Sequence, residues 1–214
     1  MLKVNEIFYS IQGESSYAGL PCVFVRLTGC NLRCSYCDTR YAYEEGKDLK
    51  IGEIIDRVMS YRCRLVEITG GEPLIQEETP DLTYRLLEKG FEVLLETNGS
   101  IDISTIDERC VKILDIKCPS SGQEEKNDLE NLKRLSVKDE IKFVIGSRED
   151  YLYAQNIISL IRKKNLKLKP PLFSTLYNKM DSKLLAEWIL ADHLDVRLQI
   201  QLHKIIWGSE TRGV

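Results

Sequence analysis

Short apolar runs rich in β-branched residues recur along the chain, and segments with helical periodicity separate them. The runs fall at Cys22–Leu27, Leu65–Thr69, Glu92–Glu96, Val111–Ile116, Glu140–Ile145, Pro171–Phe173 and Val196–Gln201. Runs of this length and composition are typical of buried strands. Because strands and helices alternate, the pattern favours a mainly parallel sheet with right-handed crossovers.

Two of the predicted helices have defined starting points. Thr79 stands directly before Pro80, so we expect Thr79 to cap a helix that Gly90 ends. Ser147, with Asp150 three residues later, predicts a capping box at the start of another helix. Both helices would lie between predicted strands, as crossovers require.

The predicted strands are too few for a closed eight-unit barrel. Between Glu92–Glu96 and Val111–Ile116 there is no convincing apolar helical face, so one crossover helix is expected to be missing. We therefore predict an α/β fold, an open, partial parallel β/α barrel of about six strands, with an edge strand over Val4–Tyr9. No linker-like tract divides residues 1–214, which are predicted to form a single domain. Chemistry in such folds lies at the carboxyl ends of the strands.

Composition and charge restrict the class of protein. Hydrophobic residues make up 43% and charged residues 29%, which is typical of a globular protein. The balance of 30 Lys and Arg against 33 Asp and Glu argues against direct binding of nucleic acid through its phosphates. No apolar run reaches the roughly 20 residues needed to cross a bilayer, and the N-terminus has no apolar signal core. We expect a cytoplasmic protein with no membrane partner.

Three of the seven cysteines lie within eight residues. Cys30, Cys34 and Cys37 follow the spacing C-x3-C-x2-C directly after the first predicted buried strand. A structural zinc site usually takes two pairs of ligands, and the chain has no second pair. Three thiolates suit a [4Fe-4S] cluster whose fourth iron stays open to a substrate or cosubstrate. The remaining cysteines lack this spacing and are interpreted as small buried hydrophobic residues: Cys22, Cys63, Cys110 and Cys118.

The cysteine spacing, with Tyr36 just before the last cysteine, resembles that of the radical S-adenosylmethionine (SAM) superfamily. In that superfamily the open iron binds the methionine moiety of SAM, and one electron cleaves the sulfonium to give a 5′-deoxyadenosyl radical. Gly70-Gly71-Glu72-Pro73 follows the strand over 65–69 and resembles the superfamily's GGEP motif. The resemblance implies that Gly71 and Glu72 contact SAM.

The same resemblance implies further SAM contacts near the cysteines and at the ends of later strands. These are Tyr36, Gly99, Phe173, Ser174, Thr175 and Leu176. Asp115 and Lys117 are added because they stand at the end of another predicted strand, and Asp38 because it adjoins the last cysteine. Lys117 is of special interest, because a cation at the end of a strand can bind a carboxylate.

The flanking segments narrow the resemblance to the 7-carboxy-7-deazaguanine synthase family. The segments that carry it are Ile11–Glu14, Gly19–Pro21, Phe24–Leu27, Cys37–Thr39 and the C-terminal QLHKIIWGSETRGV. It reaches from about residue 10 to the end of the sequence, and roughly 123–172 has no distinctive match. The resemblance implies conversion of 6-carboxy-5,6,7,8-tetrahydropterin to 7-carboxy-7-deazaguanine with release of ammonia, a step towards the 7-deazapurine bases of tRNA.

The family resemblance also implies a substrate site. Its members would be Ile11, Gln12, Gly13, Glu14, Arg26, Thr97, His203 and Val214. A flat pterin needs in-plane hydrogen bonds, which Gln12 and Glu14 would supply, and its carboxylate needs a cation or a metal. Thr39 is implied as a ligand of Mg²⁺, a hard cation that prefers oxygen. Asp38 and Glu14 are the candidate catalytic groups.

Two other functions stay open at this point. A glycyl-radical-enzyme activase of the same superfamily would share the cysteines and GGEP but would not need the pterin-facing residues. A structural metal or electron-transfer protein would hold its metal with a complete set of protein ligands. The family resemblance also implies an electron donor of the flavodoxin or ferredoxin type and a homodimer, which would cover exposed sheet edges.

Overall fold

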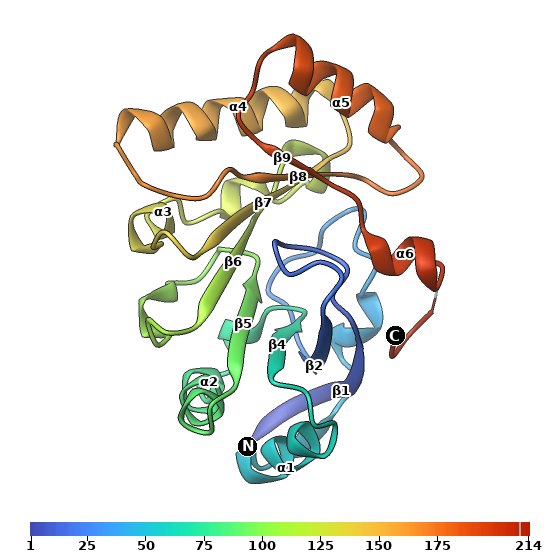
Figure 1. Cartoon of the computed structure of the whole chain (residues 1–214), viewed down its shortest axis with the longest axis vertical. Coiled ribbons are helices and arrows are strands. Elements are labelled where there is room, and N and C mark those ends of the chain that lie inside the picture. The colour runs from blue at the N-terminus through green and yellow to red at the C-terminus, as the bar shows by residue number, and fades with distance from the viewer. Residues whose placement is uncertain (210) are drawn as a thin grey trace.

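The computed structural model describes residues 1–209 and 211–214, and within them nine strands form one curved sheet in the order β3-β1-β2-β4-β5-β6-β7-β8-β9 (Figure 1). The strands are β1 (Leu2–Ile11), β2 (Pro21–Leu27), β3 (Lys47–Leu49), β4 (Leu65–Gly70), β5 (Glu92–Thr97), β6 (Val111–Ile116), β7 (Glu140–Ile145), β8 (Leu172–Thr175) and β9 (Arg197–Gln199). From β2 to β9 every neighbouring pair is parallel, which joins seven strands. The sheet ends at β3 and β9 without closing, so the predicted open parallel barrel is confirmed.

β1 is antiparallel to β2 and is not the edge strand that the sequence predicted over Val4–Tyr9. β3 pairs with its other side, from Leu2 opposite Leu49 to Val4 opposite Lys47. The segment Lys47–Leu49 contains two charged residues and no apolar run, so no pattern indicated a strand there.

The loop over 12–20, between β1 and β2, crosses the amino-terminal end of the barrel. The Tyr17 hydroxyl donates to Glu92 at 2.8 Å, and the Ser16 amide donates to Glu140 at 2.9 Å. Glu92 and Glu140 are the first residues of β5 and β7. The loop is therefore attached to the starts of two parallel strands, and residues at its beginning can face the barrel interior.

Helices pack against the outer face of the sheet, where two apolar clusters fill the interface (Figure 1). They are α1 (Ile51–Ser60), α2 (Thr79–Glu88), α3 (Asn131–Arg134), α4 (Arg148–Lys163) and α5 (Ser182–Ala191). The short helix α6 (Leu202–Ile206) lies instead beside the barrel interior. Between β5 and β6 the described chain forms only a short 3₁₀ turn, Ile103–Thr105, which confirms the missing crossover helix. None of the helices in the described residues has the length and apolar character that a membrane span needs.

The starts of α2 and α4 test the capping predictions. The Ser147 hydroxyl accepts from the Asp150 amide at 3.2 Å, as predicted, but the Asp150 carboxylate binds the amides of Gly146 and Ser120 instead of completing a box. The cap predicted at Thr79 is wrong. Thr79 is buried and already helical, and its hydroxyl donates to the Pro73 carbonyl at 2.6 Å.

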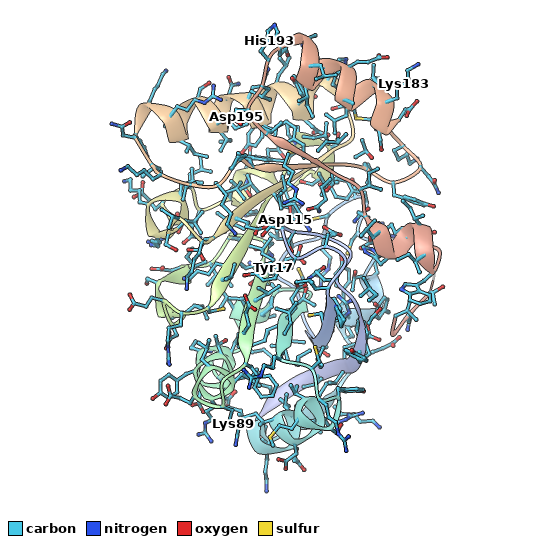
Figure 2. All side chains as sticks on the ribbon, viewed as in Figure 1. Tyr17, Lys89, Asp115, Lys183, His193 and Asp195 are labelled. Carbon is cyan, nitrogen blue, oxygen red and sulfur yellow. The ribbon has the colours of Figure 1, made fainter. Side chains whose placement is uncertain are left out.

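The inner face of the sheet changes character along the strands. Near their amino-terminal ends it is apolar, and Phe8 and Phe24 stack there with ring centroids 5.0 Å apart. Nearer the carboxyl ends it becomes polar. Figure 2 shows Asp115 in the middle of the molecule, whereas Lys89, Lys183 and His193 lie at its periphery.

Candidate active site

A cavity of about 740 Å³ lies inside the curve of the sheet. It is lined by the carboxyl-terminal parts of β4 to β7, the loop after β2, the start of the loop over 12–20 and the C-terminal segment. The structure thus brings together chain segments almost two hundred residues apart. All the predicted site residues line this cavity except Glu72, Gly99, Phe173, Ser174 and Thr175.

Cys30, Cys34 and Cys37 lie on the loop after β2, half-buried, with free thiols, and all three line the cavity. The Leu32 amide donates to the Cys30 sulfur at 3.4 Å. Burial raises the pKa of the Cys30 and Cys34 thiols. Within residues 1–209 and 211–214, no three His, Cys, Asp or Glu side chains are grouped as ligands of a single ion. In a [4Fe-4S] cluster each cysteine binds its own iron, so three thiols around one cavity fit that cofactor.

The other four cysteines lie outside the cavity lining. Cys22, Cys110 and Cys118 are fully buried, as predicted for small hydrophobic residues. Cys63 is only half-buried, and its thiol is 3.3 Å from the Pro21 carbonyl.

The turn after β4 supports the cysteine loop from beneath. The Glu72 amide donates to the Gly29 carbonyl at 2.8 Å, and the Gly71 amide donates to the Leu27 carbonyl at 3.2 Å. A Cβ at Gly71 would stand 2.1 Å from the Gly29 oxygen and 2.7 Å from the Cβ of Cys30. No side chain fits there, so this glycine sets how closely the turn approaches the first cysteine.

Glu72 lies fully buried behind this turn. Its carboxylate accepts hydrogen bonds from the Leu74 amide at 3.0 Å, the Thr97 hydroxyl at 2.8 Å and the Asn98 amide at 2.6 Å. Burial raises the pKa of Glu72, although these hydrogen bonds oppose the shift. The side chain thus joins the ends of β4 and β5 and lies behind the cavity surface. The resemblance implied that Glu72 contacts SAM, which would require it to reach the cavity.

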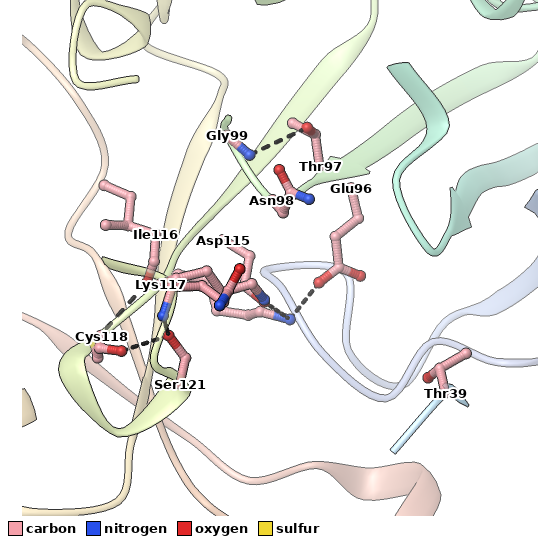
Figure 3. A network of polar contacts seen from close by, with 12 residues as sticks. Thr39, Glu96, Thr97, Asn98, Gly99, Asp115, Ile116, Lys117, Cys118 and Ser121 are labelled. Carbon is pink, nitrogen blue, oxygen red and sulfur yellow. Dashed lines mark hydrogen bonds and ion pairs between the residues drawn. The ribbon is translucent and has the colours of Figure 1, made fainter. Parts of the chain in front are cut away.

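Two buried polar atoms of cavity residues have no hydrogen-bond partner in the described part of the chain: the Tyr36 hydroxyl and Asp115 Oδ1. The other oxygen of Asp115 accepts from the Lys117 ammonium at 2.9 Å (Figure 3). Burial raises the pKa of Asp115, but Lys117 and Lys142 outweigh it, so the net shift is downward and the aspartate is ionised. Buried polar atoms are rarely left unpaired. An unpaired donor and acceptor beside the thiols fit a polar cofactor such as SAM.

Lys142 of β7 stands among carboxylates on the cavity floor. Its ammonium lies 2.9 Å from Glu14 and 3.4 Å from Asp115, and it also binds Glu96. Burial lowers the pKa of Lys142, but these carboxylates raise it well above the ordinary value. Burial likewise raises the pKa of Glu14, whereas Lys142 and its other partners bring it down to about 2. Lys142 and Glu14 therefore form a fully ionised pair.

Sequence reasoning missed Glu67, Glu96 and Lys142, which all line the cavity. A signal was present, because each is a charged residue that follows directly on apolar residues within a strand. Side chains along a strand alternate between its faces, so these positions share the inner face with Asp115. Charged residues are almost never buried in such runs without a partner or a function.

The segment over 201–203 contacts the start of the loop over 12–20. The Leu202 amide donates to the Gly13 carbonyl at 3.0 Å, and the Gln201 amide group donates to Glu14 at 2.6 Å. A Cβ at Gly13 would lie 2.2 Å from Nδ1 of His203, so only glycine permits this contact. Burial lowers the pKa of His203, which favours the neutral ring.

Asp38, just after the last cysteine of the loop, anchors that loop to α6. Its carboxylate lies 2.7 Å from the Lys204 ammonium and accepts from the Thr39 hydroxyl at 3.0 Å. Desolvation raises the pKa of Asp38, but the Lys204 ammonium outweighs this effect, so the net pKa is lowered to about 2. Across the cavity, Arg26 uses Nε to pair with Glu6 at 2.7 Å.

The predicted SAM contacts on β8 are only partly at the cavity. Leu176 lines it, but the Phe173 ring packs on the outer face, 5.5 Å from that of Phe143 between centroids. Ser174 accepts from Gln199 at 3.3 Å, and the Thr175 hydroxyl is 3.0 Å from that of Ser182.

Residues 24–167 match the family model of the radical SAM superfamily. With three cysteines at the mouth of an open parallel barrel, the chain is a member of that superfamily, whose cofactors are a [4Fe-4S] cluster and SAM. Proteins named 7-carboxy-7-deazaguanine synthase match along the whole chain. That of Koribacter versatilis is 44% identical over 100% of both chains, and that of Chlorobaculum tepidum is 45% identical over 100% of this chain and 97% of its own. The chain belongs to the 7-carboxy-7-deazaguanine synthase family and is an enzyme.

A solved structure supports the fold independently. The crystal structure of QueE from Escherichia coli superposes with a TM-score of 0.78 and covers 94% of this chain and 93% of its own, at 24% sequence identity. The full-length match to synthases does not favour the activase or the structural metal protein that the cysteine spacing alone left open.

Proposed function

We propose that this enzyme converts 6-carboxy-5,6,7,8-tetrahydropterin to 7-carboxy-7-deazaguanine and ammonia, within 7-deazapurine biosynthesis. The observation that carries the proposal is that the cysteine loop and the substrate-facing residues share one cavity. Cys30, Cys34 and Cys37 line one part of it, and Glu14 and His203 line another. An enzyme that only activated a partner protein would not need these substrate-facing polar residues beside the cysteine loop.

The roles of the residues near the thiols follow from their chemistry. Cys30, Cys34 and Cys37 would hold the cluster. When bound, the cluster and SAM together would supply the carbon radical that removes a hydrogen atom from the substrate. The unpaired Tyr36 hydroxyl would donate to SAM and Asp115 Oδ1 would accept from it. Lys117 has N–H groups to offer the SAM carboxylate beyond the one it gives Asp115.

The pterin would lie against the polar part of the cavity. Glu14 is ionised and would accept from ring N–H or amino groups, and Arg26 would pair with the substrate carboxylate. His203 is neutral and would offer one donor and one acceptor. Thr97, Ile11, the backbone of Gly13 and the terminal residue Val214 complete the proposed contacts.

Thr39 and Asp38 supply oxygen atoms next to the cysteine loop, and we propose a Mg²⁺ site there. One neutral hydroxyl and a carboxylate already paired with Lys204 make a weak site by themselves. The ion would need the substrate carboxylate and waters to complete its octahedron. Asp38 and Glu14 are the proposed catalytic groups, because both are ionised and can accept a proton from substrate or from a metal-bound water.

Further proposals concern the state and partners of the protein. We propose a single radical-SAM domain over 1–214, an electron donor of the flavodoxin or ferredoxin type, and a cytoplasmic location, which free cysteines support. We also propose a homodimer. Exposed apolar side chains on and after the end strand β9 support an interface there, and they include Leu198, Ile200, Ile205 and Trp207. Sedimentation analysis at micromolar concentration would give twice the chain mass for a dimer.

The decisive experiment is a product assay on anaerobically reconstituted protein with SAM, the carboxypterin, Mg²⁺ and a reductant, and with no second protein. We expect 7-carboxy-7-deazaguanine by mass spectrometry in amounts exceeding the enzyme. Cys34→Ala should lose iron and product, whereas the control Cys118→Ala should keep both, because Cys118 lies outside the cavity lining. Absence of product from a protein that holds its cluster and cleaves SAM would refute the proposed substrate.

A further inference from the structure

We propose that Glu67 is an uncharged carboxylic acid at the floor of the cavity, and that its O–H and C=O groups recognise the N–H and C=O of the amide edge of the pterin. The inference rests on the proposed function for the identity of the ligand. Glu67 lines the cavity but is only 3% exposed, and it belongs to β4, directly beneath the turn of the GGEP motif.

No basic side chain in the described residues lies within ion-pairing distance of Glu67. The cations nearest to it are already paired, Arg26 with Glu6 at 2.7 Å and Lys142 with Glu14 at 2.9 Å. A buried carboxyl group without a cation of its own is more stable in the neutral form, because the charged form cannot recover its lost hydration.

The groups that face Glu67 from neighbouring elements strengthen this conclusion. They are Cys22 and Arg26 on β2, Glu14 on the loop over 12–20, Glu96 on β5 and Lys142 on β7. Burial and then Glu96 raise the pKa of Glu67 well above its usual value, Glu14 adds to the shift, and Lys142 and Gln12 oppose it. The four carboxyl groups on the cavity floor belong to Glu14, Glu67, Glu96 and Asp115. Glu14 and Asp115 are ionised, and Lys142 and Lys117 balance their charges.

The position of the proton follows from the orientation of Gln12. The Gln12 Oε1 atom accepts from the Glu14 amide at 3.0 Å, so its Nε2 must point the other way, where it donates to Oε2 of Glu67. Oε2 is then the carbonyl oxygen, and the proton resides on Oε1. Gln12 was predicted to read the pterin directly, but each end of its amide already has a protein partner, and its N–H group points towards Glu67.

The surroundings of Glu67 fit a flat heterocycle. Phe24 is its register partner on β2, and Phe24 and Phe8 form a stacked apolar wall that also lines the cavity. A carboxylic acid presents one donor beside one acceptor, which matches an amide N–H beside C=O. A carboxylate presents only acceptors and would repel the amide carbonyl.

Two variants distinguish a protonated Glu67 from an ionised one. Glu67→Gln keeps a donor beside an acceptor, so we expect its KM for the carboxypterin to stay within about threefold of wild type at neutral pH. Glu67→Met has similar length and no polar atoms, so we expect a KM higher by roughly tenfold to a hundredfold with kcat less affected. The wild-type KM should rise in alkaline solution as Glu67 ionises, and the Gln variant should lose this rise. Circular dichroism verifies that each variant is folded.

Infrared spectroscopy measures the proton without turnover. The difference spectrum of wild type minus Glu67→Gln at neutral pH should contain the C=O stretch of a protonated carboxyl group, and alkali should remove it. A difference spectrum with a carboxylate band alone would overturn the inference, as would a Met variant with unchanged KM. If the band is present but wild type makes no product from the carboxypterin, the proposed function and the pterin contact fail together, while the uncharged Glu67 stands.

Discussion

Replacing Glu72 by Gln tests whether this residue serves the fold or the cofactor. Gln has the same shape, but one of its two carboxamide ends carries hydrogens and cannot accept. The Glu72 carboxylate accepts from Leu74 and Thr97 on one oxygen and from Asn98 on the other. In either orientation of the new amide, at least one buried backbone N–H therefore loses its partner and faces another N–H.

The magnitude follows from these contacts. Losing a hydrogen bond to a charged acceptor and leaving a buried donor unpaired together cost about 3 kcal/mol, since each contributes roughly 1.5 kcal/mol or more. Because Glu72 is fully buried, solvent does not compensate. For a chain of this size, about 3 kcal/mol lowers the melting temperature by roughly 6 to 12 °C.

Thermal and urea unfolding of the protein without cofactors measure this directly. Glu77→Gln is the matched control, because Glu77 lies five residues away on the same turn region and is exposed. A Glu72→Gln protein as stable as the control, with SAM affinity alone reduced, would refute a structural role and assign Glu72 to the cofactor.

Three further predictions concern the cysteine loop and its surroundings. Gly71→Ala should abolish iron loading, because the added Cβ collides with the Gly29 carbonyl and the Cys30 side chain. Absorbance after reconstitution measures the loading. The control Gly52→Ala should load normally, because its Cβ would meet nothing within 4 Å. Tyr36→Phe should leave stability unchanged or slightly higher, since it removes an unpaired buried hydroxyl, and should weaken SAM binding in calorimetry by roughly fivefold to tenfold; equal affinity would contradict the contact. Asp38→Asn should melt slightly below wild type at pH 6, and most of the difference should be lost by pH 2. The folded pKa of about 2 is below the unfolded value, so the stabilisation by Lys204 is fully present above about pH 4 and is lost as the pH falls through the folded pKa. A difference that persists unchanged at pH 2 would exclude the ion pair as its source.

Features that depend on short spacing were predictable from sequence. The cysteine triplet, the paired glycines after β4 and the missing helix after β5 are all local patterns, and the structure places them as expected. The cap at Thr79 failed for a tertiary reason. Its hydroxyl finds the Pro73 carbonyl six residues away, which competes with the capping position.

Features that depend on distant partners were not predictable. The resemblance assigns Glu72 to SAM, but its hydrogen bonds with Thr97 and Asn98, about 25 residues further along the chain, left no trace in the sequence. The floor of the cavity was missed for a similar reason. Glu67 and Lys142 each interrupt an apolar run by one residue, and only the assembled sheet shows that both point inward.

The hydrogen bond between the Leu202 amide and the Gly13 carbonyl joins two segments that both lie outside the superfamily match. The cysteines and the GGEP turn lie inside the segment common to the superfamily, 24–167, whereas Gln12, Glu14 and His203 come from outside it. Under the proposed roles, the residues that would hold the cluster and some of those that would contact the substrate, such as Glu14 and His203, thus come from different parts of the sequence. Because a Cβ at Gly13 would lie 2.2 Å from Nδ1 of His203, we expect a substitution in either segment to require a matching change in the other.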